Sequence, residues 1–274
     1  MVRFEVLAVG RELLIGRTLN TNAHWIGRRL ALLGAMINEI TTVDDDLEEI
    51  AAGLRTCLRR RPDVLVVVGG LGPTPDDMTL RGVARGLGKR LNLNNAALEL
   101  IKERYAKRGL GKIEITPARK KMATLPTGAV PVRNELGTAP GVRIVVGRTT
   151  IFCLPGVPSE MRSVCARIVI PEVRGRLGKL YRRAARMRIE GIFESALAPI
   201  IAAELKLHPG TYIKSHPRGI REGRSRIELD IVSVKRRESE AERVCASVAK
   251  EISEAVATSG AAIVSATGLG RERA

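Results

Sequence analysis

The chain has 274 residues and a formal net charge of +17, from 46 basic and 29 acidic side chains. Because a domain usually has about 150 residues, this length predicts two domains. The hydrophobic content of 45% excludes a mainly disordered chain. No apolar run reaches the roughly 20 residues that a membrane-spanning helix needs. The opening Met-Val-Arg-Phe-Glu lacks the apolar core of a secretory signal, so we expect a cytoplasmic protein with no membrane partner.

The positive charge is spread over both halves of the chain and forms no tail. A positive field attracts anions such as nucleic acid or nucleotide phosphates, although a solvated, arginine-rich surface gives the same composition. Aromatic residues make up only 3%, which disfavours single-strand binding by base stacking. The four cysteines include no CxxC pair and the three histidines no HExxH motif, so each histidine is interpreted as structural.

Apolar runs alternate with amphipathic stretches over the first 170 residues. Strands are predicted at residues 6–9, 37–43, 63–68, 144–146 and 150–154, and helices at residues 22–33, 47–60, 79–87, 95–108 and 158–174. The run from Asp63 to Val68 is nearly all β-branched, which is typical of a strand buried on both faces in a parallel sheet. This alternation predicts a doubly wound α/β layer.

A linker is predicted over residues 174–180, because Pro171, Gly175 and Gly178 interrupt the helical pattern. Strands are then predicted at residues 186–191, 211–215, 226–234 and 261–264, and helices at residues 194–205 and 239–256. Their order predicts a small α+β domain of about 95 residues.

The strongest functional signal is the segment Gly69-Gly-Leu-Gly-Pro-Thr-Pro-Asp-Asp-Met-Thr79, which follows the most hydrophobic strand and precedes a helix. Ligands of open α/β sheets bind at the carboxyl ends of the strands. Glycines allow close backbone approach, and free N–H groups at a helix start favour phosphate. Asp76 and Asp77 could hold a divalent cation that also contacts phosphate. The alternative is a plain turn in which one aspartate caps the helix.

Four further loops have the same kind of position. Gly10–Gly16 follows the first strand and contains Glu12, an acceptor suited to a ribose, an amide or a heterocycle. Asn20 and Asn22 could position a polar ligand or cap the next helix, and in Val43–Asp46 one aspartate is expected to cap a helix while another joins Asp77. The Asn134–Gly141 and Pro155–Met161 segments are either plain loops or further anion-binding turns.

The motifs GRELLIG, TVDDD, GGLGPTPDDMT, NELGTAPG and PGVPSEM resemble those of the CinA family in order and spacing. The amino-terminal part of that family resembles the MogA/MoaB molybdopterin-binding fold. The resemblance covers roughly residues 3–170, and residues 180–265 resemble the KH-like domain of CinA proteins with weaker motifs. It implies a three-layer α/β/α domain with a mostly parallel sheet over residues 1–176, followed by a KH-like α+β domain over residues 180–268.

The resemblance implies a divalent-metal-dependent hydrolase of a nucleotide-sugar pyrophosphate such as ADP-ribose. Asp77 and Asp45 would be catalytic, and together with Asp76 they would hold Mg²⁺, Mn²⁺ or Co²⁺. The implied ligand-binding residues are Glu12, Asn22, Gly69, Gly70, Gly72, Pro73, Thr74, Thr138, Gly156 and Ser159. The sequence has GGLG and Asp76 where the MogA pattern has GGTG and an arginine, which disfavours molybdopterin adenylylation.

The alternative function is a non-catalytic molybdopterin- or nucleotide-binding protein, and a third is a nucleic-acid-associated protein acting through its basic surface. The resemblance implies a small anionic nucleotide or pterin as the ligand, and a homo-oligomer. The Gly-Glu-Ser-Cys motif of the CinA deamidase domain does not occur, so deamidation is not expected. The helix–GxxG–helix signature of nucleic-acid-binding KH domains is also absent, and Gly219–Gly223 is predicted to be a hairpin loop.

Overall fold

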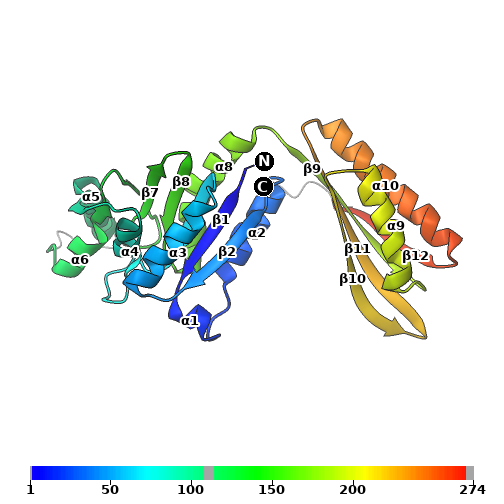
Figure 1. Ribbon diagram of the computed structural model, residues 1–274, viewed down its shortest axis with the longest axis horizontal. Helices are drawn as coiled ribbons and strands as arrows, with labels where there is room; N and C mark the ends of the chain where they lie inside the picture. The colour runs from blue at the N-terminus through cyan, green and yellow to red at the C-terminus, as the bar shows by residue number, and fades with distance from the viewer. Residues whose placement is uncertain (1, 108–113, 270–274) are drawn as a thin grey trace. The chain divides into compact units, whose positions relative to one another are not determined.

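The computed structural model describes residues 2–107 and 114–269 and divides into two compact units. The first unit contains residues up to Ala31 and Ala35–Leu177, and the second contains Leu32–Gly34 and the residues from Gly178 onward. Figure 1 shows the elements of both units in chain order. The predicted helix end at Arg108 lies outside the described residues.

The first unit is built on a six-stranded sheet with the strand order β2-β1-β3-β8-β7-β6. The four strands at the β2 side are parallel, whereas β7 and β6 each run antiparallel to the preceding strand of that order. The strands are β1 (Phe4–Val9), β2 (Ile37–Val43), β3 (Val64–Val68), β6 (Val130–Val132), β7 (Gly141–Val146) and β8 (Thr149–Leu154). A separate ribbon pairs β4 (Leu91–Leu93) with β5 (Thr124–Pro126). The predicted α/β class with a mostly parallel sheet is confirmed.

Helices cover both faces of this sheet, because successive side chains of a strand point to opposite faces. In β1, Leu7 and Val9 join one core cluster, while the fully buried Phe4 and Val6 lie on the other face. On the first face lie α3 (Leu47–Arg59), α4 (Thr79–Gly86), α5 (Asn95–Tyr105) and the short α6 (Pro117–Met122). On the second face lie α2 (Thr21–Leu32), α7 (Pro158–Val164), the π-helical turn η2 (Cys165–Val169) and α8 (Ile170–Leu177). The short α1 (Arg11–Leu14) follows β1.

Two glycines of α4 set the distance between α4 and α3. A Cβ atom on Gly82 would lie 2.4 Å from the Cγ2 atom of Ile50, and one on Gly86 would lie 2.8 Å from the Cδ2 atom of Leu54. The absence of side chains therefore lets the two helices pack closely. Since both helices begin just after a loop at the carboxyl edge of the sheet, this contact also holds those two loops together.

A buried ion pair stabilises the opposite edge of the sheet. The Glu5 carboxylate in β1 is fully buried and accepts hydrogen bonds from Nε and Nη2 of Arg60 at 2.9 and 2.7 Å. The Nε atom of Arg3 donates a further bond to it at 2.9 Å. A buried carboxylate needs such partners, so Arg60 is a structural residue of this unit.

The second unit is a four-stranded antiparallel sheet with the order β10-β11-β9-β12 and two helices on one face (Figure 1). Its elements are β9 (Tyr181–Glu190), α9 (Glu194–Leu207), β10 (Thr211–Arg221), β11 (Arg224–Lys235), α10 (Glu238–Thr258) and β12 (Ala262–Leu269). This β-α-β-β-α-β order is the split βαβ, ferredoxin-like arrangement. The likeness to a KH domain stays a prediction, and no helix–GxxG–helix turn occurs in the described part of this unit.

One boundary error concerns the end of the first unit, and larger ones concern the second unit, where β9 begins at Tyr181, β10 ends at Arg221 and β12 ends at Leu269. The predicted linker start at Arg174 is wrong, because α8 continues to Leu177. Arg176 donates to the Glu172 carboxylate at 2.8 Å and to the Thr150 hydroxyl at 2.8 Å, which fastens the last helical turn to β8. Only three residues then separate α8 from β9. The hairpin predicted at Gly219–Gly223 occurs, but its loop is shorter than predicted, because Gly219–Arg221 belong to β10 and only Glu222 and Gly223 form the turn.

Candidate functional site

Four loops meet at the carboxyl edge of the first sheet, because they follow the parallel strands β1, β2, β3 and β8. Together they enclose a cavity of about 280 Å³. Eight of the predicted site residues line it, namely Glu12, Asn22, Asp45, Gly69, Gly70, Asp76, Asp77 and Gly156. Thr18, Leu19 and Thr21, which the sequence reasoning did not single out, also line it. The structure thus brings most of the predicted residues to one place.

The glycine-rich loop leaves β3 in a conformation that suits only glycine. Gly69 and Gly70 have φ angles of 112° and 60°, which L side chains rarely adopt. A Cβ atom on Gly69 would lie 2.2 Å from the carbonyl oxygen of Val9 at the end of β1. The Thr79 hydroxyl donates to the Gly69 carbonyl at 2.7 Å and closes the loop onto the start of α4. The loop is therefore held by backbone contacts on both sides.

The three consecutive aspartates after β2 have three different roles. Asp44 forms an ion pair with Arg11 at 2.8 Å. Asp46 is the N-cap of α3 and accepts from the N–H groups of Glu48 and Glu49 at 2.8 and 3.1 Å, as one aspartate was predicted to do. Asp45 is the one that lines the cavity.

Asp45 lies in a negatively charged environment. Burial raises the pKa of its carboxyl, the Arg11 N–H bond of 2.8 Å opposes this, and the charges of Glu12, Asp44 and Asp76 raise the pKa further. Asp77, which also lines the cavity, accepts from the Thr74 N–H at 2.9 Å. A bound cation would relieve the repulsion among these carboxylates.

The donor set fits a hard divalent cation, because Mg²⁺ prefers carboxylate oxygens and keeps several other ligands from water or phosphate. In residues 2–107 and 114–269, Asp45, Asp76 and Asp77 do not place three ligand atoms within 4.8 Å of one another. The carboxylates therefore form an open arrangement that a ligand phosphate and water would complete, and no closed cage made of protein atoms.

A second cavity of about 250 Å³ adjoins the first and shares Gly70 and Asp77 with it. Its polar lining includes Arg81 from α4 and Lys121 from α6. Burial lowers the pKa of Lys121, against the opposing charges of Asp77 and Asp76. An acidic cavity and a cationic one thus meet at Asp77.

Sequence reasoning missed both cations of this second cavity. Lys121 belongs to α6, which was not predicted although Thr116 and Pro117 form a recognisable helix start before Arg119-Lys120-Lys121. Its Nζ atom donates to the carbonyl oxygen of Thr74, which ties α6 to the glycine-rich loop.

Some predicted ligand-binding residues have other surroundings. Gly72 lines the cationic cavity only, and Pro73 and Thr74, the next residues of the same loop, line neither cavity. Thr138 and Ser159 line neither cavity. The amide nitrogen of Asn22 donates to the Gly156 carbonyl at 2.7 Å, so this side chain ties the start of α2 to the loop after β8.

The Asn134–Gly141 segment is fastened to α7. The amide nitrogen of Asn134 donates to the Ala139 carbonyl at 2.9 Å and to the Glu160 carboxylate at 2.7 Å. Its Oδ1 atom accepts from the N–H groups of Leu136 and Gly137 at 3.1 and 2.9 Å. These bonds use the polar groups of Asn134 internally, which favours the plain-loop interpretation of the segment.

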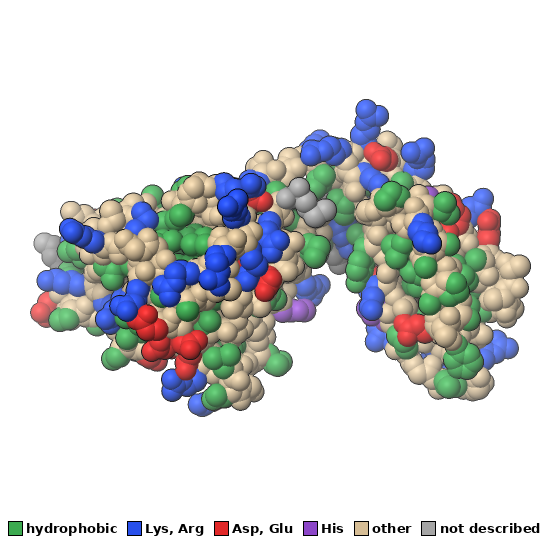
Figure 2. Space-filling model, viewed as in Figure 1, with side chains coloured by type: hydrophobic (Ala, Val, Ile, Leu, Met, Phe, Trp, Pro, Cys, Tyr) green, Lys and Arg blue, Asp and Glu red, His purple; other side chains and the backbone are tan. Residues whose placement is uncertain are grey.

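The surface charge differs between the site and its surroundings. Figure 2 shows acidic side chains gathered at one edge of the first unit, near α1 and the start of α3, with basic side chains over much of the visible face. This acidic edge is therefore a local feature of a chain whose net charge is +17. The positive field of the whole chain attracts anionic ligands to the molecule.

Residues 5–175 match the family model of a probable molybdopterin-binding domain. A crystal structure of CinA from Thermoplasma acidophilum, a protein described as having unknown function, is 40% identical with a TM-score of 0.57 and covers 62% of this chain and 97% of its own. The chain belongs to the CinA-type molybdopterin-binding domain family. That match supports the MogA/MoaB-like fold of the first unit.

Two archaeal relatives extend the similarity into the second unit. A protein of Metallosphaera sedula is 44% identical over 227 residues, which is 83% of this chain and 84% of the relative. A protein of Sulfurisphaera tokodaii is 38% identical over 260 residues, or 95% of this chain and 97% of the relative. Among the described residues of the CinA-type chain, no helix combines the length and apolar character needed to cross a bilayer.

Proposed function

We propose that this CinA-type chain hydrolyses a nucleotide-sugar pyrophosphate such as ADP-ribose with the help of a divalent cation. The observation that carries the proposal is the meeting of two cavities at Asp77, one lined by Asp45 and Asp76 and the other by Arg81 and Lys121. A pyrophosphate between two ribosides needs both kinds of surface, since its oxygens are anionic and its cleavage requires a metal-activated water.

Each part of the site has a distinct task in this proposal. The N–H groups of Gly70 and Gly72, with Arg81 and Lys121, bind the diphosphate oxygens. Asp45, Asp76 and Asp77 hold the cation, which when bound neutralises phosphate charge and lowers the pKa of a water molecule. Glu12, which also lines the acidic cavity, accepts hydrogen bonds from the ribose or the base.

The test is an assay of the purified full chain with ADP-ribose and Mg²⁺, Mn²⁺ or Co²⁺, with AMP as the measured product. We expect AMP only when a metal is present and its loss on chelation. Asp77→Asn should lower kcat about 100-fold or more, because it removes one charge from the cation site. Asp44→Asn is the matched control from the same acidic edge, since Asp44 pairs with Arg11 and does not line the cavity. Its activity should stay within about threefold of wild type, in line with the small energy of an exposed ion pair.

Either of two results would refute the proposal. AMP formation that is unchanged by chelation would exclude the metal, and a wild-type rate in Asp77→Asn would exclude this site. Circular dichroism of both variants ensures that a lost rate does not reflect a lost fold.

A second candidate is a non-catalytic molybdopterin- or nucleotide-binding protein, which the match of residues 5–175 to a probable molybdopterin-binding domain favours. Calorimetric titration with molybdopterin and with ADP-ribose separates the two. Tight pterin binding without AMP formation under any metal would support this candidate.

The same preparations, measured by light scattering, test our proposal that the chain forms a homo-oligomer. Nucleic-acid binding that survives about 200 mM salt would instead favour the third hypothesis, because purely electrostatic contacts weaken steeply with salt.

A further inference from the structure

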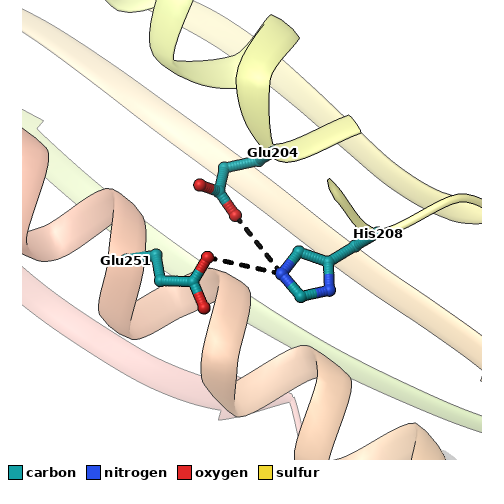
Figure 3. A group of neighbouring side chains, drawn as sticks. All are labelled: Glu204, His208 and Glu251. Atoms are coloured by element: carbon teal, nitrogen blue, oxygen red, sulfur yellow. Dashed lines mark hydrogen bonds and ion pairs between the residues drawn. The ribbon is translucent and has the colours of Figure 1, made fainter. Parts of the chain in front are cut away.

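Three side chains with metal-binding atoms converge in the second unit, and none of them belongs to the site described above. They are Glu204 and His208 at the end of α9 and Glu251 from α10 (Figure 3). The Nε2 atom of His208 lies 3.6 Å from Oε2 of Glu204 and 3.3 Å from Oε2 of Glu251. All three ligand atoms lie within 4.8 Å of one another.

The local structure holds each of these groups in place. Glu204 and His208 are four residues apart, which places them on one face of a helix, and the His208 N–H donates to the Glu204 carbonyl at 2.9 Å. The Ser247 hydroxyl, one turn before Glu251 on α10, donates to Oε1 of Glu251 at 2.6 Å. This bond leaves Oε2 of Glu251 directed toward the histidine (Figure 3). Partners of this kind commonly orient metal ligands.

The Glu204 carboxylate is the second observation that points to a ligand. Its side chain is only 8% exposed, and its buried Oε2 atom has no hydrogen-bond partner among the described residues. A buried carboxylate oxygen that accepts no hydrogen bond is costly, so an oxygen aimed into this cluster needs a cation or a proton.

We propose that Glu204, His208 and Glu251 bind a divalent transition-metal ion of the zinc class, which links the end of α9 to α10. A tetrahedral zinc ion with bonds of about 2.1 Å separates its ligand atoms by about 3.4 Å. Nε2 of His208 lies 3.6 Å from the Glu204 oxygen and 3.3 Å from the Glu251 oxygen, so these distances match a zinc site without movement of the side chains. An imidazole with two carboxylates selects zinc-class ions over Mg²⁺ or Ca²⁺, which take only oxygen ligands.

This proposal does not depend on the pyrophosphatase proposal, because the two sites share no residue. The sequence analysis interpreted His208 as a structural residue because it belongs to no HExxH motif. Glu251 follows it by 43 residues, so the group forms only when α10 packs against α9.

The test uses the full chain in an Asp45→Asn, Asp77→Asn background, so that metal held by the first unit does not contribute. Zn²⁺ is titrated by calorimetry, and thermal unfolding is measured with and without Zn²⁺. We expect one equivalent of bound zinc and a raised Tm. His208→Gln should weaken binding about tenfold or more and remove the rise in Tm, since each ligand is required for affinity. Glu251→Gln, at a half-buried position that tolerates substitution, should do the same.

His216→Gln is the matched control in the same unit. His216 faces a single carboxylate, Asp230, at 3.3 Å and belongs to no three-residue group in the described part of the chain. Its zinc binding should equal that of the background. Co²⁺ gives an independent reading, because a tetrahedral site produces visible absorption bands that His208→Gln should abolish. The proposal is overturned if no zinc binds, or if both His208→Gln and Glu251→Gln bind zinc as the background does. In that case the imidazole serves only as a proton-bearing bridge between two carboxylates.

Discussion

Replacing Gly69 by alanine tests whether the backbone contact between β1 and the glycine-rich loop builds the site. Gly69 has a φ of 112°, and a Cβ atom would lie 2.2 Å from the Val9 carbonyl oxygen. The conformation alone costs a non-glycine residue about 1–3 kcal/mol. The oxygen belongs to the backbone of β1 and cannot rotate away, so the ends of two adjacent strands must separate. We therefore expect a total loss of roughly 2–4 kcal/mol in the free energy of unfolding.

Gly88→Ala is the matched control, because Gly88 also has a positive φ, 63°, but a Cβ atom added there would meet no atom of the described residues within 4 Å. The free energy of unfolding of Gly88→Ala should fall by only about 1–2 kcal/mol, the cost of a positive φ for alanine. For a unit of this size, the difference corresponds to a Tm about 3–8 °C lower in Gly69→Ala than in Gly88→Ala. Fluorescence of the single tryptophan, Trp25 in α2, reports unfolding of the first unit alone. Equal Tm values for the two variants would refute the reasoning.

Two further predictions concern charged groups of the first unit. Arg60→Met leaves the fully buried Glu5 carboxylate without its main partner and should cost about 3 kcal/mol in urea unfolding. Arg85→Met, which removes an exposed ion pair, is the control and should cost less than about 1 kcal/mol. Equal losses of stability in the two variants would contradict the structural role of Arg60. For Asp63, burial raises the pKa of the carboxyl, but the Arg148 hydrogen bond and other cationic partners outweigh burial and leave the pKa below the ordinary 3.8. Its stabilisation is then present above the unfolded pKa and lost as the pH falls through the folded one. The Tm of Asp63→Asn should lie below that of wild type at pH 7, and the gap should close toward pH ~3; a gap independent of pH would exclude this ion pair as the cause.

Much of the fold could be predicted because local composition and tertiary environment agree. The β-branched run of β3 occurs where a strand is buried on both faces, and the strands predicted at residues 144–146 and 150–154 pair as a hairpin that turns at Gly147. Short elements without a periodic pattern were missed, including α1, α6 and the β4–β5 ribbon. They are stabilised by contacts with distant parts of the chain more than by their own sequence.

The candidate site shows the same division. The loops of Glu12, Asp45, Asp77 and Gly156 could be placed at one edge from strand order alone, and the structure brings all four to one cavity. The roles of Asp44, Asp45 and Asp46 could not be separated, because adjacent residues differ only in the directions that the end of β2 gives their side chains.

Length, composition and charge by themselves determined that this is a folded chain of two-domain size with a positive field, and its motifs determined the CinA-type family. Size, charge and family depend only on residue types and on short spacings along the chain, and both can be read directly from the sequence. Only the tertiary structure decided that Lys121 lies beside Asp77, and that Glu204, His208 and Glu251 converge. Side chains separated by some 40 residues meet only when helices pack, and packing depends on the whole core. The net charge of +17 therefore describes the field around the molecule, while the chemistry that we propose resides in two small clusters of side chains.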